Sequence, residues 1–480
     1  MTSILGNCSN IQTLRLHAEC YGNGEQGMPF ETLCMIGSLP YLQSLELFLN
    51  NIVFPAAAAA ESCDSNGVGD DATTVAPSRV ATRELCIQQL VRPCGQLKRL
   101  VLRGTAFKFL QQHMDTPTES RELSKVGTTA NSAVAFRLPS LHDLTLDIPG
   151  LSEPELSYWL HHCPNLSSLS LPGGLTWEWS DDFLHTVAES SPRLVAFSIN
   201  GSSFGSFAIS EERLTALVRA LSAGGKLKVL AARACQLGDS TLQALQECAP
   251  GLEHLDISLT RSAGLSTAGL LSYLCHPGAR NLKCVEADGI WIQSYEFREF
   301  VRQQEAEAQQ GQEPLGWACK DTLERLVIGF SSPDRTTTHP APTTADQPGA
   351  IEPEAAARPL SWYMYKHLST LTQLEQLQFS QTCLDLSSEG GIYQLQTLKR
   401  LRTFGIESCG YAALTQDQVR WMASTTHWPR LETIYINPGV SCERQIQTWL
   451  TEMGRQDDLQ LQSLQRQKLQ QYYSNMISPW

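Results

Sequence analysis

The sequence predicts an α/β fold in which a short strand followed by a helix repeats along the chain. The string L-x-x-L-x-L, with Ile, Val, Phe or Ala substituting, occurs thirteen times in 480 residues. Seven of the twelve intervals between successive starts lie between 25 and 31 residues, which is a typical period for a stacked solenoid. Apolar residues three or four apart, the spacing of an amphipathic helix, follow several of the strings.

Each string predicts one strand. The closing apolar residues of the string alternate with polar ones, and this period of two indicates a strand that is buried on one face. The strings begin at Ile11, Leu42, Leu97, Leu141, Leu166, Leu194, Leu227, Leu252, Leu282, Leu323, Leu374, Leu401 and Leu431.

Helices are expected between the strands. The clearest patterns are Leu156 to Leu160, Leu214 to Leu221 and Leu242 to Leu245. A strand and a helix repeated at this period make a leucine-rich-repeat solenoid. We therefore predict a ribonuclease-inhibitor-like horseshoe of about 13 irregular repeats, with a parallel sheet on its concave face and helices outside.

The repeats account for residues 1–440 in this prediction. Three segments of low complexity, at about 56–84, 111–131 and 331–359, are expected to be disordered insertions, because they hold too little apolar material to offset the entropy of ordering. Residues 441–480 are expected to form a capping helix and a Gln-rich tail.

Composition excludes several classes of function. The 36 basic and 49 acidic residues give a formal charge of −13 without a basic run, which argues against a nucleic acid or an anionic membrane as partner. No stretch of eighteen apolar residues and no signal peptide are present, so we expect a soluble protein of the cytoplasm or nucleus. Fifteen cysteines without a C-x-x-C pair indicate reduced, mostly buried thiols.

The sequence contains no signature of catalysis. The serine-hydrolase, P-loop, zinc-protease and dinucleotide-binding motifs are all missing. The run from His161 to Cys163 comes nearest to a metal cluster, but adjacent residues on a helix point in different directions. We predict a protein that is not an enzyme and that has no catalytic residue, metal or cofactor.

The segment from Cys235 to Leu252 resembles the cysteine-containing leucine-rich repeat of F-box proteins. The irregular spacing, the insertions and the segment from Trp421 to Leu431 are similar to the large fungal families of F-box/leucine-rich-repeat proteins, over roughly residues 5 to 440. This resemblance implies a non-enzymatic substrate receptor of an SCF-type ubiquitin ligase that recognises a protein target.

The chain departs from these families at its N-terminus. Their F-box binds a Skp1-type adaptor, whereas Met1 here falls inside the helix-to-strand part of a repeat. We therefore expect a Skp1-type partner only if an F-box is encoded upstream of Met1. Two alternatives stay open: an interaction scaffold or inhibitor unrelated to ubiquitin, and a GTPase-activating leucine-rich-repeat regulator.

The candidate binding residues are the polar ones within the strands, because alternation turns them to the concave face once the leucines are buried. The candidates there are Arg103, Arg233, Asp256, Glu286 and Asp288. Three tryptophans follow strands in loops at the edge of this face and are candidate interface anchors; they are Trp177, Trp179 and Trp291.

The same register makes a prediction about stability. Reversing the charges of Glu286 and Asp288 is expected to leave stability almost unchanged, since exposed substitutions have small effects. An Asp in place of Leu230 or Leu255 is expected to unfold the repeat, because an unpaired carboxylate would enter the core.

Overall fold

The computed structural model describes residues 10–19, 35–36, 38–50, 85–86, 91, 94–104, 107–108, 137–148, 151–172, 179–200, 209–260, 264–310, 316–330, 360–382, 391–408, 415–436, 443–452, 454 and 460–463. The chain divides into two compact units, Met1–Leu194 and Val195–Trp480. The insertions predicted at 56–84, 111–131 and 331–359 lie outside the described residues.

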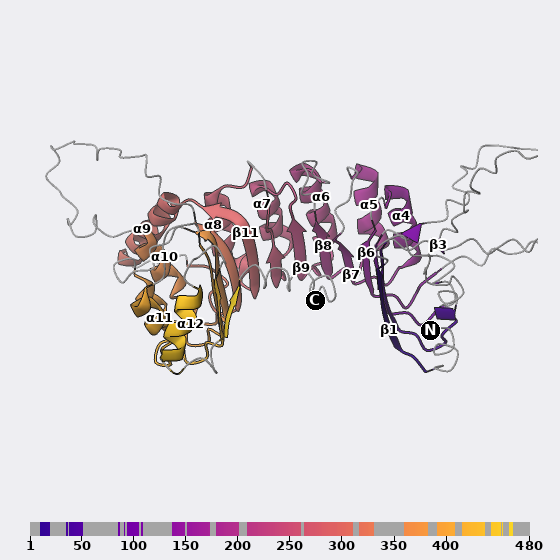
Figure 1. Ribbon diagram of the computed structural model, residues 1–480. Helices are drawn as coiled ribbons and strands as arrows, with labels where there is room; N and C mark the ends of the chain where they lie inside the picture. Colours follow the sequence, from indigo (N-terminus) through magenta and orange to yellow (C-terminus); the bar gives the residue numbers. More distant parts are fainter. Residues whose placement is uncertain are drawn as a thin grey trace, which may run out of the picture. The chain divides into compact units, whose positions relative to one another are not determined.

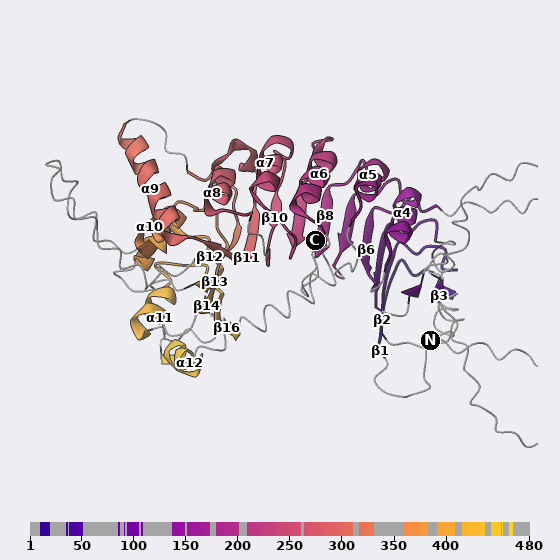
Figure 2. The same ribbon diagram turned by 90° about the horizontal axis from the view of Figure 1, so that it is seen from above.

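The first unit contains a parallel sheet in the order β1-β2-β4-β6-β7. Its strands are β1 (Thr13–Glu19), β2 (Ser44–Asn50), β4 (Arg99–Arg103), β6 (Asp143–Asp147) and β7 (Ser168–Leu171). Two short strands, β3 (Leu85–Cys86) and β5 (Phe107–Lys108), pair separately. The helices α4 (Glu153–His162) and α5 (Asp181–Ser190) lie side by side on one face of the sheet (Figures 1 and 2).

The second unit contains a parallel sheet in which β8 to β16 follow one another in chain order. Its strands are β8 (Ala196–Asn200), β9 (Val229–Arg233), β10 (His254–Asp256), β11 (Cys284–Ile292), β12 (Arg325–Phe330), β13 (Gln376–Thr382), β14 (Thr403–Ser408), β15 (Thr433–Ile436) and β16 (Gln460–Ser463). Its helices are α6 (Glu211–Ser222), α7 (Asp239–Cys248), α8 (Thr267–Cys275), α9 (Ser294–Gln309), α10 (Leu360–Leu368), α11 (Gln416–Met422) and α12 (Glu443–Glu452), with short 3₁₀ turns η1 (Pro277–Ala279) and η3 (Ile392–Thr397).

The leucines of the strings form the core between the sheet and the helices. Leu230, Leu255 and Val285 are neighbours in register on β9, β10 and β11, and each is at most 1% exposed. From each leucine of this kind, burial contributes roughly 1.5–3 kcal/mol. Figures 1 and 2 show α6, α7 and α8 side by side along one face of these strands. All thirteen strings form strands, and the predicted leucine-rich-repeat solenoid is confirmed.

Carboxylates in the first turn of one helix hold the N-terminus of the next. Asp239, the first residue of α7, accepts hydrogen bonds from the backbone N–H of Ser266 at 2.9 Å and from its hydroxyl at 2.6 Å. Ser266 in turn caps α8 by accepting from the N–H of Gly269 at 2.9 Å. Glu153 makes the same type of contact to Ser180, and Glu211 accepts from the N–H of Ser240 at 3.1 Å. These bonds fix the spacing of neighbouring repeats on the helix side.

The turns from helix to strand are joined by a second set of bonds. In most of the described repeats one carbonyl accepts two N–H groups of the next repeat: the oxygen of Lys228, for example, accepts from Glu253 at 2.7 Å and from His254 at 2.9 Å. The side-chain amide of Asn281 also donates to the carbonyl of Pro250 at 2.8 Å. Hydrogen bonds therefore join neighbouring repeats both at the N-termini of their helices and at their helix-to-strand turns.

Aromatic residues fill the core around α10. The ring of His367 lies 5.1 Å from that of Trp317 and 5.6 Å from that of Phe297, measured between ring centroids, in edge-on geometry. The side chain of His367 is buried, and this burial lowers its pKa to about 4. The imidazole is therefore neutral in the folded protein at pH 7.

The C-terminal segment differs from the expected helix and tail. The predicted helix is present as α12, and Leu450 on it is fully buried. A further strand, β16, follows α12 and pairs with β15 through Gln460 to Ser463. The sequence predicted these residues to be part of the tail because Gln is common there, whereas Leu461 pairs in register with Ile434 of β15.

Candidate functional site

Strand alternation turns a row of charged side chains to the face of the second unit's sheet opposite its helices, which we call the inner face. Asp256 and Glu286 are direct neighbours in register on β10 and β11. They flank the core residues Leu255 and Val285, so their side chains point away from the helices. Arg233 is the last residue of β9, and Arg325 is the first residue of β12.

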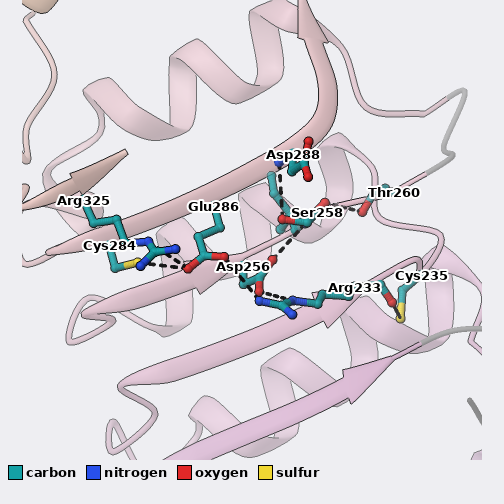
Figure 3. Close-up of polar contacts among 10 residues, drawn as sticks. Arg233, Cys235, Asp256, Ser258, Thr260, Cys284, Glu286, Asp288 and Arg325 are labelled. Atoms are coloured by element: carbon teal, nitrogen blue, oxygen red, sulfur yellow. Dashed lines mark hydrogen bonds and ion pairs between the residues drawn. The ribbon is translucent and has the colours of Figure 1, made fainter. Parts of the chain in front are cut away.

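These four side chains form a continuous chain of ion pairs, which we call the ionic row (Figure 3). Arg233 contacts Asp256 through Nε, and its Nη2 lies 3.2 Å from Glu286 Oε2. The other oxygen of Glu286, Oε1, lies 3.1 Å from Arg325 Nε. Arg325 Nη1 donates onward to Gln376 Oε1 at 2.9 Å, which carries the row to β13. The row spans five consecutive strands.

Further contacts anchor the carboxylates. The backbone N–H of Ser258 donates to Asp256 Oδ1 at 3.0 Å, and the hydroxyl of Ser258 accepts from the N–H of Asp288 at 3.3 Å. The thiol of Cys284 lies 3.8 Å from Glu286 Oε1 and donates to it. The carboxylates are therefore held in one geometry by both strand backbone and side chains.

The row is only partly accessible to water. The side chains of Asp256 and Glu286 are 6% and 15% exposed, and those of Arg233 and Arg325 are 28% and 25% exposed. Burial opposes the charge of Arg233, but the carboxylates of Asp256 and Glu286 outweigh it, so the pKa of Arg233 is raised. Burial and the charge of Asp256 raise the pKa of Glu286 despite its two arginine partners.

The structure brings together three of the residues that the sequence singled out, Arg233, Asp256 and Glu286, with Asp288 two residues further along β11. The expected exposure of Glu286 is wrong: it is enclosed by two arginines. A Lys at this position would place a third cation between them. Reversing its charge is thus a change to a partly buried ion pair rather than to a solvated surface.

Arg103 is placed differently. Arg103 lies in the first unit and is only 3% exposed, so its guanidinium is not a surface for a partner. There it neighbours Asp147 in register. Burial raises the pKa of the Asp147 carboxyl, and the charge of Arg103 opposes part of this rise. The first unit has a second such pair, with Arg99 Nε 3.5 Å from Asp143 Oδ2.

The three tryptophans have three different outcomes. Trp177 lies outside the described residues. Trp179 is not an interface anchor, because its side chain is fully buried with its ring 4.7 Å from that of Phe183. It packs against the first turn of α5, so it belongs to the core. Trp291 is 51% exposed.

Arg325 and Gln376 were missed. Both occupy the third position of their strings, LERLVI and LEQLQF. The third position faces the same side of a strand as the fifth, which carries Asp256 and Glu286. Alternation applied two residues earlier in each string would have found them.

The described residues offer little for catalysis. Burial raises the pKa of Cys94 to about 11 and the pKa values of Cys163 and Cys319 to about 12, which keeps these thiols protonated and unreactive at pH 7. His161 and His162 each contact the backbone carbonyl four residues earlier in α4. Among the described residues, no cluster of three or more His, Cys, Asp or Glu side chains is placed to bind a metal ion. None of the helices that the structure describes has both the length and the hydrophobicity of a membrane span.

Comparisons with known proteins add to the fold only. No family model and no curated protein matches the chain. Among solved structures, TLR13 from a complex with ssRNA13 is 16% identical with a TM-score of 0.38, and the match covers 74% of this chain and 42% of TLR13. The chain therefore spans less than half of TLR13.

Three more matches are similarly distant. A chain of the yeast Rad7 and Elc1 complex is 16% identical with a TM-score of 0.34, covering 62% of this chain and 76% of that one. The leucine-rich-repeat protein LegL7 of Legionella pneumophila is 15% identical with a TM-score of 0.33, over 60% and 79%. An internalin, InlF, of Listeria monocytogenes is 11% identical with a TM-score of 0.33, over 96% and 88%. Likeness at this level carries no information about function.

Proposed function

We propose that the protein is a non-enzymatic protein-recognition module whose partner binds the inner face of the second unit at the ionic row. One observation carries the proposal: ion pairs run without a break from Arg233 on β9 to Arg325 on β12. The repeats need apolar residues at the first, fourth and sixth positions of each string, because these build the core. They place no such demand on the third, fifth and seventh positions, where the row lies.

The net stability of the row does not explain its presence, although removing one partner is costly because it leaves the other charge unpaired. Taking charges out of water costs free energy that their mutual attraction seldom exceeds, and apolar residues of similar volume often stabilise as well or better. An array of fixed charges instead favours partners of complementary charge and disfavours others. The ionic row is therefore better explained by recognition than by folding.

The row is also ordered before any partner arrives. Glu286 contacts two arginines, and Asp256 contacts Arg233 and the N–H of Ser258. A surface whose side chains are already fixed loses little conformational entropy on binding, which favours affinity.

A finer proposal rests on the resemblance of the segment from Cys235 to Leu252 to the repeats of F-box proteins. In this proposal the protein is the substrate-receptor part of an SCF-type ubiquitin ligase, and an F-box upstream of Met1 would bind the Skp1-type adaptor. This proposal is tested by expressing the chain together with its in-frame upstream sequence and asking whether a Skp1-type adaptor co-purifies with it. An upstream sequence that binds no adaptor favours the scaffold or inhibitor alternative.

The ionic row can be tested with two isosteric variants. The full chain is crosslinked in an extract of its own cells, and captured proteins are quantified by mass spectrometry for wild type, Glu286→Gln and Glu253→Gln. Each variant removes one carboxylate, but Glu253 lies just before β10 and pairs with Lys228 and Lys283, which are not members of the row. We expect the capture of at least one protein to fall about tenfold in Glu286→Gln and to persist in Glu253→Gln.

Melting curves show whether both variants are folded. Equal capture by wild type and a folded Glu286→Gln protein would contradict the proposed role of the row. Equal loss in both variants would show that net charge, and not the row, determines binding.

A further inference from the structure

Two large apolar side chains stand exposed beside the ionic row. Among the described residues only five large hydrophobic side chains are exposed, and three of them come from the stretch between β10 and the start of α9. Leu259 is 53% exposed and Trp291 is 51% exposed, while Tyr295 in the first turn of α9 is 57% exposed. The remaining two, Tyr41 and Tyr158, lie in the first unit.

Leu259 and Trp291 both lie at the second half of β11, Leu259 as a neighbour from the preceding repeat and Trp291 as one of the strand's own residues. The N–H of Leu259 donates to the carbonyl of Asp288 at 2.6 Å. A Cβ placed on Gly289 would lie 3.6 Å from both Cα and Cδ2 of Leu259, so the leucine packs directly against this glycine. Trp291 follows two residues later, and its Cδ1 would lie 2.9 Å from a Cβ on Gly329 of β12. Because Gly329 has no side chain, the indole of Trp291 can lie close to its backbone.

Leu259 adopts a backbone conformation that leucine rarely takes. Its φ is 60°, in the left-handed region, where a side chain with a Cβ is strained. The bond to Asp288 and the bond from Thr260 Oγ1 to the carbonyl of Ile257 at 2.6 Å hold the turn in place. The strain places an apolar side chain in water, where it adds nothing to the core. Gly104, Ala234 and Gly289 have a positive φ at the same position of their repeats, so the left-handed turn belongs to the repeat, and Leu259 differs from them in carrying a large, exposed apolar side chain there.

Acidic charge lies next to these two residues. Asp288 is hydrogen-bonded through its backbone to Leu259 and to Ser258, and Figure 3 shows it beside Ser258, two residues along β11 from Glu286. The row and Asp288 together hold two guanidinium groups and three carboxylates, a formal excess of one negative charge. A partner that meets this region therefore gains from bringing a cation.

We propose that Leu259 and Trp291 form a docking ledge for a partner segment that presents one large apolar side chain and, close to it, a Lys or Arg that pairs with Asp288. The proposal rests on the proposed function as a protein-recognition module and names the chemistry of the partner. The apolar side chain would lie on Leu259 and Trp291, and the cation would point along β11 toward the ionic row. Aromatic and arginine side chains are the usual anchors of such contacts.

The probe for this proposal is a library of random dodecapeptides displayed on phage and selected on the immobilised full chain. We expect enriched peptides to pair a Leu, Phe, Tyr or Trp with a nearby Lys or Arg. An enriched peptide, made synthetically, is then measured by fluorescence anisotropy against four variants. Leu259→Gly removes the side chain and suits the left-handed φ, so it should fold at least as well as wild type. Trp291→Ala removes the second apolar group.

The expected results differ between variants. Leu259→Gly and Trp291→Ala should each weaken binding about tenfold or more. Asp288→Asn should weaken the basic peptide but not a matched peptide with Gln in place of Lys or Arg. Tyr41→Ser, which removes an equally exposed side chain from the first unit, should bind like wild type.

Two results would overturn the docking ledge: enriched peptides without the apolar and basic pair, or unchanged binding by folded Leu259→Gly and Trp291→Ala proteins. The crosslinking experiment separates this from the proposed function. If Glu286→Gln loses a captured protein that Leu259→Gly keeps, the ledge is refuted and the recognition role stands. If neither variant loses a partner, both are refuted.

Discussion

Replacing Asp256 by Asn is expected to weaken the repeats around β10 more than any comparable loss of one surface carboxylate. Asn keeps an oxygen that can accept from the N–H of Ser258, which now lies 3.0 Å from Asp256 Oδ1. It removes the charge that holds Arg233 from one side. Arg233 then keeps only Glu286, whose Oε2 lies 3.2 Å from its Nη2.

The size of the effect follows from burial. A hydrogen bond to a charged group contributes about 1.5–3 kcal/mol, and breaking a fully buried ion pair costs about 3–5 kcal/mol. Asp256 is 6% exposed, but Arg233 is 28% exposed and can recover some hydration. The lower range therefore applies, and we expect a loss of about 2 kcal/mol.

Hydrogen exchange followed by mass spectrometry is the suitable assay, because a solenoid opens locally and each repeat depends mainly on its neighbours. Peptides covering β9 to β11 report the free energy of local opening. Glu253→Gln is the matched control, three residues earlier in the same repeat. Glu253 accepts from Lys228 at 2.8 Å and Lys283 at 2.7 Å, and these bonds lower its pKa to about 2.

The control separates burial from charge. The two lysines are 56% and 46% exposed, so water and salt screen their attraction to Glu253. We expect Glu253→Gln to cost less than half of the loss in Asp256→Asn, and to cost still less in high salt. An equal or larger loss in Glu253→Gln would refute the reasoning that burial makes the ionic row different from the edge pairs.

Three further predictions concern the core and the repeat contacts. Leu255→Asp should abolish the cooperative melting of the second unit measured by circular dichroism, because Leu255 is fully buried and the carboxylate would have no partner. Since burial lowers the pKa of His367 to about 4, its contribution to stability should be complete above about pH 6.5, fall by about 3 kcal/mol between pH 6.5 and 4, and change little below that. His367→Phe should flatten this part of a pH series of urea titrations. Asp239→Ala should cost about 1 kcal/mol in hydrogen exchange at the start of α8, because it removes both bonds to Ser266.

The sequence by itself determined the repeats and their strands. Period-two alternation works in this fold because every strand has one face against the helices, so Leu230 and Leu255 could be assigned to the core and Glu286 to the opposite face. The helices α4, α6 and α7 followed from apolar spacing alone. These features depend on residues close together in the chain.

Accessibility could not be predicted in the same way. Trp179 was expected at an edge, yet it is fully buried, because a tryptophan after a strand can turn either outward or under the next helix. Glu286 was expected to be solvated, yet it is enclosed by Arg233 and Arg325, which are 53 and 39 positions away in the sequence. Alternation gives the side of the sheet to which a residue points and says nothing of what its neighbours cover.

Only the tertiary structure decided which charges meet. The intervals between strings vary, so the residue opposite Asp256 is fixed by strand register and not by a constant offset in sequence. The same holds for Leu259, whose left-handed turn depends on a bond to Asp288 in the next repeat. The sequence set the core because burial of apolar residues is a local pattern, whereas the ionic row and the docking ledge arise from contacts between repeats, which exist only after the repeats have stacked.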